Sequence, residues 1–264
     1  MIPKTIHYCW FGGKPLPELA IKCISSWKKH FPSYEIKEWN ETNYDVHKIS
    51  YTSEAYHAKK YAFVSDYARF DILHQYGGIY FDTDVEVIRP FDNILAKGGF
   101  MGLESKKTVA AGLGVGCNAG SDIIHQILES YNKLHFLNVD GSYNLKTVVD
   151  HVTTVLKKNG LKGKNEIQFL DDLVIYPTEY FSPMLVKTRI LNITKNTYSI
   201  HHYAGSWLSD EDLKRVELRK QICATFGDTI FSKTIIFFLL VTKRIKTHGL
   251  FDTIKFCYKK YRES

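Results

Sequence analysis

The chain has 264 residues, of which 44% are hydrophobic and 14% are aromatic. This composition excludes a largely disordered chain and predicts one large α/β domain, or two small ones, with a well-buried core. The 35 Lys and Arg residues exceed the 28 Asp and Glu residues, and the excess lies in residues 213–264, which carry twelve basic and four acidic side chains. A near-neutral body with a basic tail argues against a nucleic-acid-binding protein and indicates that the tail meets an anionic surface.

Cysteine usage and hydropathy point to a cytoplasmic protein. The five cysteines are scattered and form no Cys-x-x-Cys pair, so a disulfide framework or a cysteine zinc site is not expected and a reducing compartment is favoured. The first residues show no charged segment followed by a long apolar stretch, which argues against a signal peptide. The longest apolar run, residues 235–241, is far shorter than the roughly 20 residues that span a bilayer.

Strands and helices are predicted to alternate along the first 90 residues. Residues 4–10 are rich in β-branched and aromatic side chains and predict a buried strand, which Gly12 and Gly13 end. A helix is expected at 18–30, a strand at 34–39 and the clearest helix at 56–75, where Gly77 and Gly78 follow as a C-cap. Short strands are then expected at 79–81 and 85–88. This alternation is typical of a parallel α/β sheet.

The remaining chain is predicted to be less regular. Residues 101–118 are rich in glycine and are expected to be irregular, with helices at 122–134 and 145–158 and short strands at 174–176 and 198–202. From residue 210 the pattern changes, and three basic amphipathic helices are expected at 210–224, 229–246 and 250–261. We therefore predict a main domain at 1–212 and a basic helical extension at 213–264.

Two aspartates directly follow the apolar strand predicted at 79–81. Two carboxylates two residues apart, here Asp82 and Asp84, can hold one divalent cation that bridges a diphosphate. A chain with 15 Asp residues contains about one Asp-x-Asp by chance, and a second one, Asp210 and Asp212, opens a predicted helix, where acids complement the dipole. Asp82 and Asp84 differ because acids that end a buried strand are commonly held there by a ligand or a metal.

Two further groups of polar residues allow both a structural and a functional interpretation. Asp66 and Arg69 share one helix face; their spacing alone favours a surface ion pair, whereas a functional pair would hold sugar hydroxyls and neutralise developing charge. Residues 201–207, with the sequence HHYAGSW, follow a predicted strand. Their imidazoles either ligate a divalent cation or belong to the core, and Gly205 lets the backbone approach a phosphate. Trp10 either stacks on a flat base or packs in the core.

Three segments resemble one family of enzymes. They are residues 2–13 (IPKTIHYCWFGG), 62–73 (AFVSDYARFDIL) and 76–84 (YGGIYFDTD). They resemble the DXD glycosyltransferases with the GT-A fold, and most of all glycosyltransferase family 32, which includes bacterial capsular and O-antigen transferases, yeast initiating mannosyltransferases and, more distantly, the clostridial glucosylating toxins. The match covers residues 1–210. It implies a GT-A-like α/β catalytic domain with a mostly parallel central sheet flanked by helices, followed by the basic helical extension.

The resemblance also implies roles for individual residues in the first half of the chain. Trp10 stacks on the nucleobase, usually uracil. Asp66 and Arg69 hold the donor sugar and its leaving diphosphate. Tyr80 and Asp82 contact the ribose and the donor sugar, and Asp82 reaches the metal partly through water. Asp84 ligates Mn²⁺ or Mg²⁺ directly.

For the segment that ends at residue 207, the resemblance implies that His202 is the better metal ligand of the two histidines. Gly205 and Ser206 lie beside the diphosphate, and the Trp207 N–H is aimed at the departing oxygen. Ser206 and Trp207 are adjacent here, whereas one residue separates the Ser and the Trp of the toxins.

These observations predict a retaining, metal-dependent glycosyltransferase. It moves a hexose or N-acetylhexosamine from a nucleotide sugar, expected to be UDP-linked, to a glycan or a polyprenyl-diphosphate-linked glycan in surface polysaccharide synthesis. It works as a peripheral protein on an anionic membrane, at the inner face, without nucleic acid as a partner. One alternative is a metal-dependent nucleotidyl or phosphoryl transferase, which is disfavoured because no phosphate-binding glycine loop is present. The other is a non-catalytic membrane-binding adaptor, which leaves the acidic residues unexplained.

Overall fold

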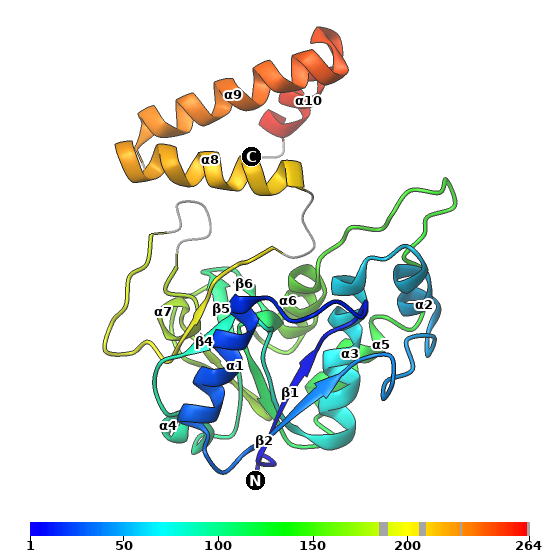
Figure 1. Ribbon diagram of the computed structural model, residues 1–264, viewed down its shortest axis with the longest axis vertical. Coiled ribbons are helices and arrows are strands. Elements are labelled where there is room, and N and C mark those ends of the chain that lie inside the picture. Colours follow the sequence, from blue (N-terminus) through cyan, green and yellow to red (C-terminus); the bar gives the residue numbers. More distant parts are fainter. Residues whose placement is uncertain (185–189, 206–209, 228, 263–264) are drawn as a thin grey trace. The chain divides into compact units, whose positions relative to one another are not determined.

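A computed structural model describes residues 1–184, 190–205, 210–227 and 229–262 (Figure 1). The chain divides into two compact units, one of residues 1–184 and 191–207 and the other of residues 185–190 and 208–264. The sequence analysis places the boundary at residue 212, which lies inside the helix that begins at Asp210. We refer to the first as the α/β unit and to the second as the helical unit.

The α/β unit is built on a mixed sheet. Its strands lie in the order β2 (Glu35–Trp39), β1 (Thr5–Cys9), β3 (Gly78–Tyr80), β7 (Val115–Cys117), β5 (Gly99–Ser105), β9 (Leu173–Tyr176) and β8 (Gln168–Leu170), and β6 (Thr108–Val109) pairs with β5. Strands β2, β1, β3, β5 and β9 run in one direction, and β7, β8 and β6 run in the other. The expected α/β fold with a mostly parallel sheet is confirmed.

Helices flank this sheet and bury two apolar clusters against it (Figure 1). Helices α3 (Tyr61–Tyr76), α5 (Asp122–Glu129) and α6 (Val148–Lys158) contribute to one cluster, and α1 (Glu18–His30) contributes to the other. Side chains alternate along β3 and the residue that follows it: Tyr80 belongs to the first cluster, whereas Ile79 and Phe81 belong to the second. The remaining elements of the unit are short: α2 (Ser50–His57), β4 (Val85–Val87), α4 (Asp92–Leu95), η1 (Ala111–Leu113), α7 (Thr178–Phe181) and β10 (Ser199–His201).

The structure corrects two of the expected elements. The helix expected at 56–75 is divided between α2 and α3, because Lys59 adopts a left-handed backbone with φ of 57° and interrupts the helical hydrogen bonds. The segment 101–118, expected to be irregular, contains strands β5, β6 and β7 instead. Its glycines make room for aromatic rings: a Cβ at Gly116 would lie 2.4 Å from a ring carbon of Phe100, and one at Gly102 would lie 2.6 Å from Phe181.

The helical unit contains the three helices expected near the C-terminus, α8 (Asp210–Phe226), α9 (Ile230–His248) and α10 (Leu250–Arg262). A capping box begins α9, in which the Thr229 and Ser232 side chains each accept a hydrogen bond from the other's backbone N–H. Helix α9 contacts both α8 and α10. Among the described residues, no helix is long and apolar enough to cross a membrane.

Candidate active site

The first half of the site is positioned by β3, along which side chains point alternately to the two sides of the sheet. Tyr80 and Asp82 are two residues apart and point to the side of the sheet that α3 covers, while Phe81 packs in the opposite cluster. Asp66 and Arg69 are three residues apart on α3 and therefore share the helix face that turns toward this strand. The strand end and the helix face bring four polar side chains together at the carboxyl end of β3.

Arg69 is the centre of this group. Its Nη2 lies 2.8 Å from Asp66 Oδ1 and 3.4 Å from Asp82 Oδ1, and its guanidinium lies 5.0 Å from the Tyr80 ring centre. The Tyr80 hydroxyl donates a hydrogen bond to Asp82 Oδ1 at 3.0 Å. The side chains of Arg69 and Asp66 are only 4% and 13% exposed, so the surface ion pair that their spacing favoured is wrong. The two carboxylates instead neutralise the buried guanidinium and hold its planar fork at the carboxyl end of β3.

The second half of the site comes from a strand far along the chain. Strand β10 pairs antiparallel with β4, which places His201 opposite Val85 and beside Asp84. The His201 Nε2 atom lies 3.0 Å from Asp84 Oδ1, and the backbone N–H of Ala204 donates to Asp84 Oδ2 at 2.7 Å. Asp84 is thus held by the segment that the sequence analysis singled out at residues 201–207.

Asp82, Asp84 and His201 fit a divalent cation. Each offers one ligand atom, and these three atoms lie within 4.8 Å of one another. Two carboxylates and an imidazole suit Mn²⁺ and, with water completing the shell, Mg²⁺. The sequence analysis favoured His202 over His201 as the metal ligand. In the structure, His202 Nε2 instead lies 2.8 Å from Glu86 Oε2. Among the described residues, the histidine that groups with Asp82 and Asp84 is His201.

The surroundings of Asp66 and Asp84 shift their pKa values in opposite directions. Burial raises the pKa of Asp66 to about 7, against the opposing charge of Arg69. Burial also acts to raise the pKa of Asp84, but the charge and hydrogen bond of His201 outweigh it and lower that pKa to about 2. Burial acts to lower the pKa of His201, but Asp84, and to a lesser degree Asp82, stabilise its charged form and raise that pKa. A positive charge is therefore favoured at the place that a cation would take.

Gly112 completes the wall of the site. Its carbonyl accepts a hydrogen bond of 3.4 Å from the Asp82 backbone N–H. A Cβ at this position would lie 2.2 Å from Asp82 Oδ2 and 3.1 Å from its Cγ, so only glycine leaves the carboxylate where it is. The sequence analysis did not select Gly112, because nothing in a glycine-rich segment distinguishes the glycine that meets the acid.

The other expected site residues are placed as follows. Trp10 is partly buried, packs against the cluster on the α1 side and donates its Nε1–H to Lys14 O at 2.6 Å. Gly205 adopts a left-handed backbone with φ of 66°, which agrees with the freedom expected of it. Ser206 and Trp207 lie outside the described residues.

The relatives found in comparisons with known proteins are glycosyltransferases. Residues 17–101 match the family model described as the glycosyltransferase sugar-binding region containing the DXD motif. An uncharacterised glycosyltransferase of Acanthamoeba polyphaga mimivirus is 27% identical over 198 residues, which cover 69% of this chain and 76% of that protein. Inositol phosphoceramide mannosyltransferase 1 of Schizosaccharomyces pombe is 28% identical over 111 residues, 38% of this chain and 33% of that protein. Among solved structures, the PaToxG glycosyltransferase has 22% identity and a TM-score of 0.47, with 60% of this chain and 69% of that chain covered.

The chain spans three quarters of the mimivirus protein but only a third of the yeast one. The matched segment contains α3 with Asp66 and Arg69, strand β3, and the aspartates Asp82 and Asp84, which are the DXD motif itself. The protein is therefore an enzyme, a glycosyltransferase, and the resemblance of its sequence to the DXD glycosyltransferases is confirmed.

Proposed function

We propose that this glycosyltransferase uses a divalent cation, Mn²⁺ or Mg²⁺, and a UDP-linked hexose or N-acetylhexosamine, and that it retains the anomeric configuration of the sugar. The observation that carries the proposal is the grouping of Asp82, Asp84 and His201 beside the buried pair of Asp66 and Arg69. The first three residues supply ligands for a cation, and the last two supply an acceptor and a charged fork for sugar hydroxyls and phosphate oxygens.

In this proposal each residue has one task during transfer. A bound cation supplies Lewis acidity toward the leaving diphosphate. Arg69 neutralises the negative charge that grows on the leaving oxygens, and its burial makes that charge interaction strong. Asp66 accepts hydrogen bonds from donor-sugar hydroxyls, and Trp10 stacks on the uracil. The acceptor hydroxyl attacks the anomeric carbon from the side of the leaving group, the bond to diphosphate breaks, and the diphosphate takes the hydroxyl proton.

We further propose that the acceptor is a glycan, free or linked to polyprenyl diphosphate, and that transfer takes place at the inner face of a membrane during surface polysaccharide synthesis. The basic segment 213–264 supports this location, since anionic lipid attracts clustered Lys and Arg side chains. One relative is named as an inositol phosphoceramide mannosyltransferase, and a ceramide is a lipid with two long hydrocarbon chains.

A donor screen tests the transfer chemistry. The full chain is mixed with single nucleotide sugars, with and without Mn²⁺, and its melting temperature and the release of free nucleotide are measured. We expect stabilisation by a UDP-sugar only when Mn²⁺ is also present, and slow donor hydrolysis under the same condition. Equal stabilisation by UDP-sugars after chelation would contradict the metal requirement, and hydrolysis of a GDP-sugar alone would contradict the uracil assignment.

A further inference from the structure

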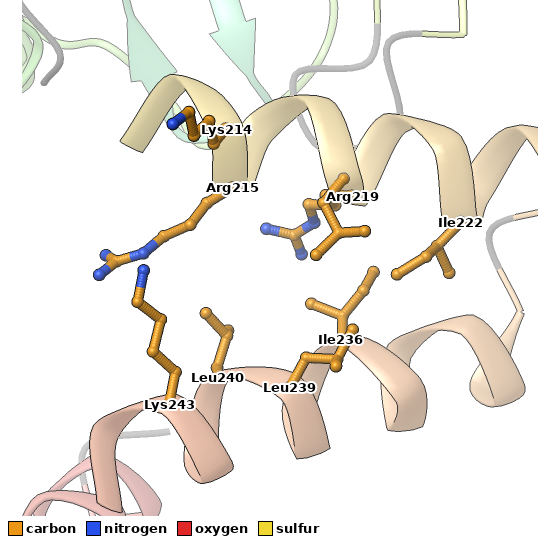
Figure 2. A pocket seen from close by; sticks show the side chains of 9 residues that line it. Lys214, Arg215, Arg219, Ile222, Ile236, Leu239, Leu240 and Lys243 are labelled. Atoms are coloured by element: carbon orange, nitrogen blue, oxygen red, sulfur yellow. The ribbon is translucent and has the colours of Figure 1, made fainter. Parts of the chain in front are cut away.

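A groove runs between α8 and α9 of the helical unit, and Figure 2 shows the side chains that line it. Helix α8 contributes residues at positions i, i+1, i+4, i+5 and i+8, and α9 contributes residues at i, i+3, i+4 and i+7, so each helix turns one face toward the groove. The lining residues are Lys214, Arg215, Leu218, Arg219, Ile222, Ile236, Leu239, Leu240 and Lys243.

The groove combines positive charge with an aliphatic wall. Four of its nine lining residues are Lys or Arg, the other five are Leu or Ile, and none is acidic. The Arg215 guanidinium and the Lys243 amine lie near each other at one end, while Ile222 and Ile236 line the other (Figure 2). Among the described residues, the buried Nε of Arg219 has no hydrogen-bond partner. Cations at one end and aliphatic side chains at the other fit a ligand with an anionic head and an apolar chain.

The helical unit also exposes large apolar side chains outside the groove lining. On α9, Phe237 and Phe238 are 55% and 61% exposed, and on α10 Phe251 is 84% exposed, with Leu250 and Ile254 also exposed. Exposed aromatic and aliphatic side chains beside basic residues are typical of helices that lie in the interface of a membrane. A second copy of this chain is a poor occupant of the same surface, because it brings the same excess of positive charge.

We propose that the α8–α9 groove binds the phosphate headgroup and the upper acyl chain of an anionic membrane lipid. The inference rests on the membrane location proposed above and not on the sugar chemistry. Lys214, Arg215, Arg219 and Lys243 contact the phosphate, and Leu218, Ile222, Ile236, Leu239 and Leu240 contact the chain.

Two variants of the full chain with equal charge separate this site from general attraction to a charged surface. The groove variant carries Arg215→Gln, Arg219→Gln and Lys243→Gln. The control carries Lys220→Gln, Lys246→Gln and Lys255→Gln, which removes one charge each from α8, α9 and α10, outside the groove lining. Co-sedimentation is measured with phosphatidylcholine vesicles that contain or lack phosphatidylglycerol, and circular dichroism melting checks that both variants are folded.

We expect the wild type to sediment with the anionic vesicles only. Each basic residue that meets the surface contributes about fivefold to binding, so the groove variant loses on the order of a hundredfold and the control far less. Equal losses in the two variants, or a wild type that stays in the supernatant, overturn the proposal. Nucleotide-sugar turnover plays no part in this measurement, so a failure here is distinct from a failure of the proposed transfer.

A soluble lipid tests the groove without a membrane and without a variant. Dihexanoylphosphatidic acid below its critical micelle concentration is compared with dihexanoylphosphatidylcholine and with inorganic phosphate, in thermal melts of the full chain. We expect protection by the phosphatidic acid alone. Equal protection by inorganic phosphate would make the groove an anion site only, and absence of protection would overturn the lipid site.

Discussion

Replacing Gly112 by alanine tests whether the position of Asp82 controls catalysis. The added Cβ would lie 2.2 Å from Asp82 Oδ2, whereas non-bonded carbon and oxygen atoms need more than 3 Å, so the carboxylate has to move by about 1 Å. Its other oxygen is held by the Tyr80 hydroxyl and by Arg69, so this movement disturbs both contacts. A displacement of this size lowers the transfer rate about a hundredfold, or about 2.7 kcal/mol in activation free energy.

We expect the same substitution to leave the fold intact, so that its effect on turnover can be told from an effect on stability. Gly112 does not need a left-handed backbone, and alanine reduces the entropy of the unfolded chain, so we expect a melting temperature close to that of the wild type. Gly163→Ala is the control, because its Cβ meets only Lys107 Cγ at 3.9 Å. The assay is nucleotide release from the best UDP-sugar, with Mn²⁺ affinity measured in parallel. Wild-type turnover in a folded Gly112→Ala variant would refute the argument.

Four further predictions concern the site and its scaffold. Asp84→Ala abolishes transfer and Mn²⁺ binding while the protein stays folded, and Mn²⁺-dependent turnover in this variant would contradict the metal assignment. Arg69→Lys lowers kcat at least tenfold, about 1.4 kcal/mol, because an ammonium cannot replace the planar fork; an unchanged kcat at saturating donor would contradict it. His201→Ala weakens Mn²⁺ binding more than His202→Ala does, and the opposite order would favour His202 as ligand. Burial holds the pKa of His7 at about 4, below its ordinary 6.5, so between these values the unfolded chain binds a proton that the folded chain does not. Urea titrations should show the wild type losing up to about 3 kcal/mol of unfolding free energy relative to a His7→Gln variant as the pH drops from 6.5 to 4, and a constant difference between the two would contradict the buried neutral imidazole.

The elements that could be predicted from the sequence are those with local signals. Strand β1, helix α1 and the three C-terminal helices lie close to their predicted positions, because apolar spacing, caps and glycine turns define them. Strands β5 and β7 were missed because glycine is a poor strand residue on its own. Their glycines are favoured only by the aromatic rings of Phe100 and Phe181 that pack over them in the folded chain.

The residues of the candidate site also differ in whether a local sequence pattern identifies them. Asp82 and Asp84 were found because an apolar strand leads directly into them, which is a local pattern. The burial of Arg69 was not predictable from spacing, since an i, i+3 pair looks the same on a solvent-exposed helix and on one that faces a sheet. The choice between His201 and His202 depends on the pairing of β10 with β4, across more than a hundred residues, and a one-residue change of register would exchange the two side chains.

The charges of the site explain why cation and donor are proposed to bind together. Three carboxylates, Asp66, Asp82 and Asp84, meet one arginine and one histidine within this small region. Asp84 raises the pKa of His201, so a cation that binds the imidazole competes with a proton for the same ring. A diphosphate that arrived without a cation would face carboxylates with Arg69 as the main counter-charge, and repulsion would oppose its binding. The arrangement of Asp82, Asp84 and His201 therefore favours a donor that enters as its metal complex.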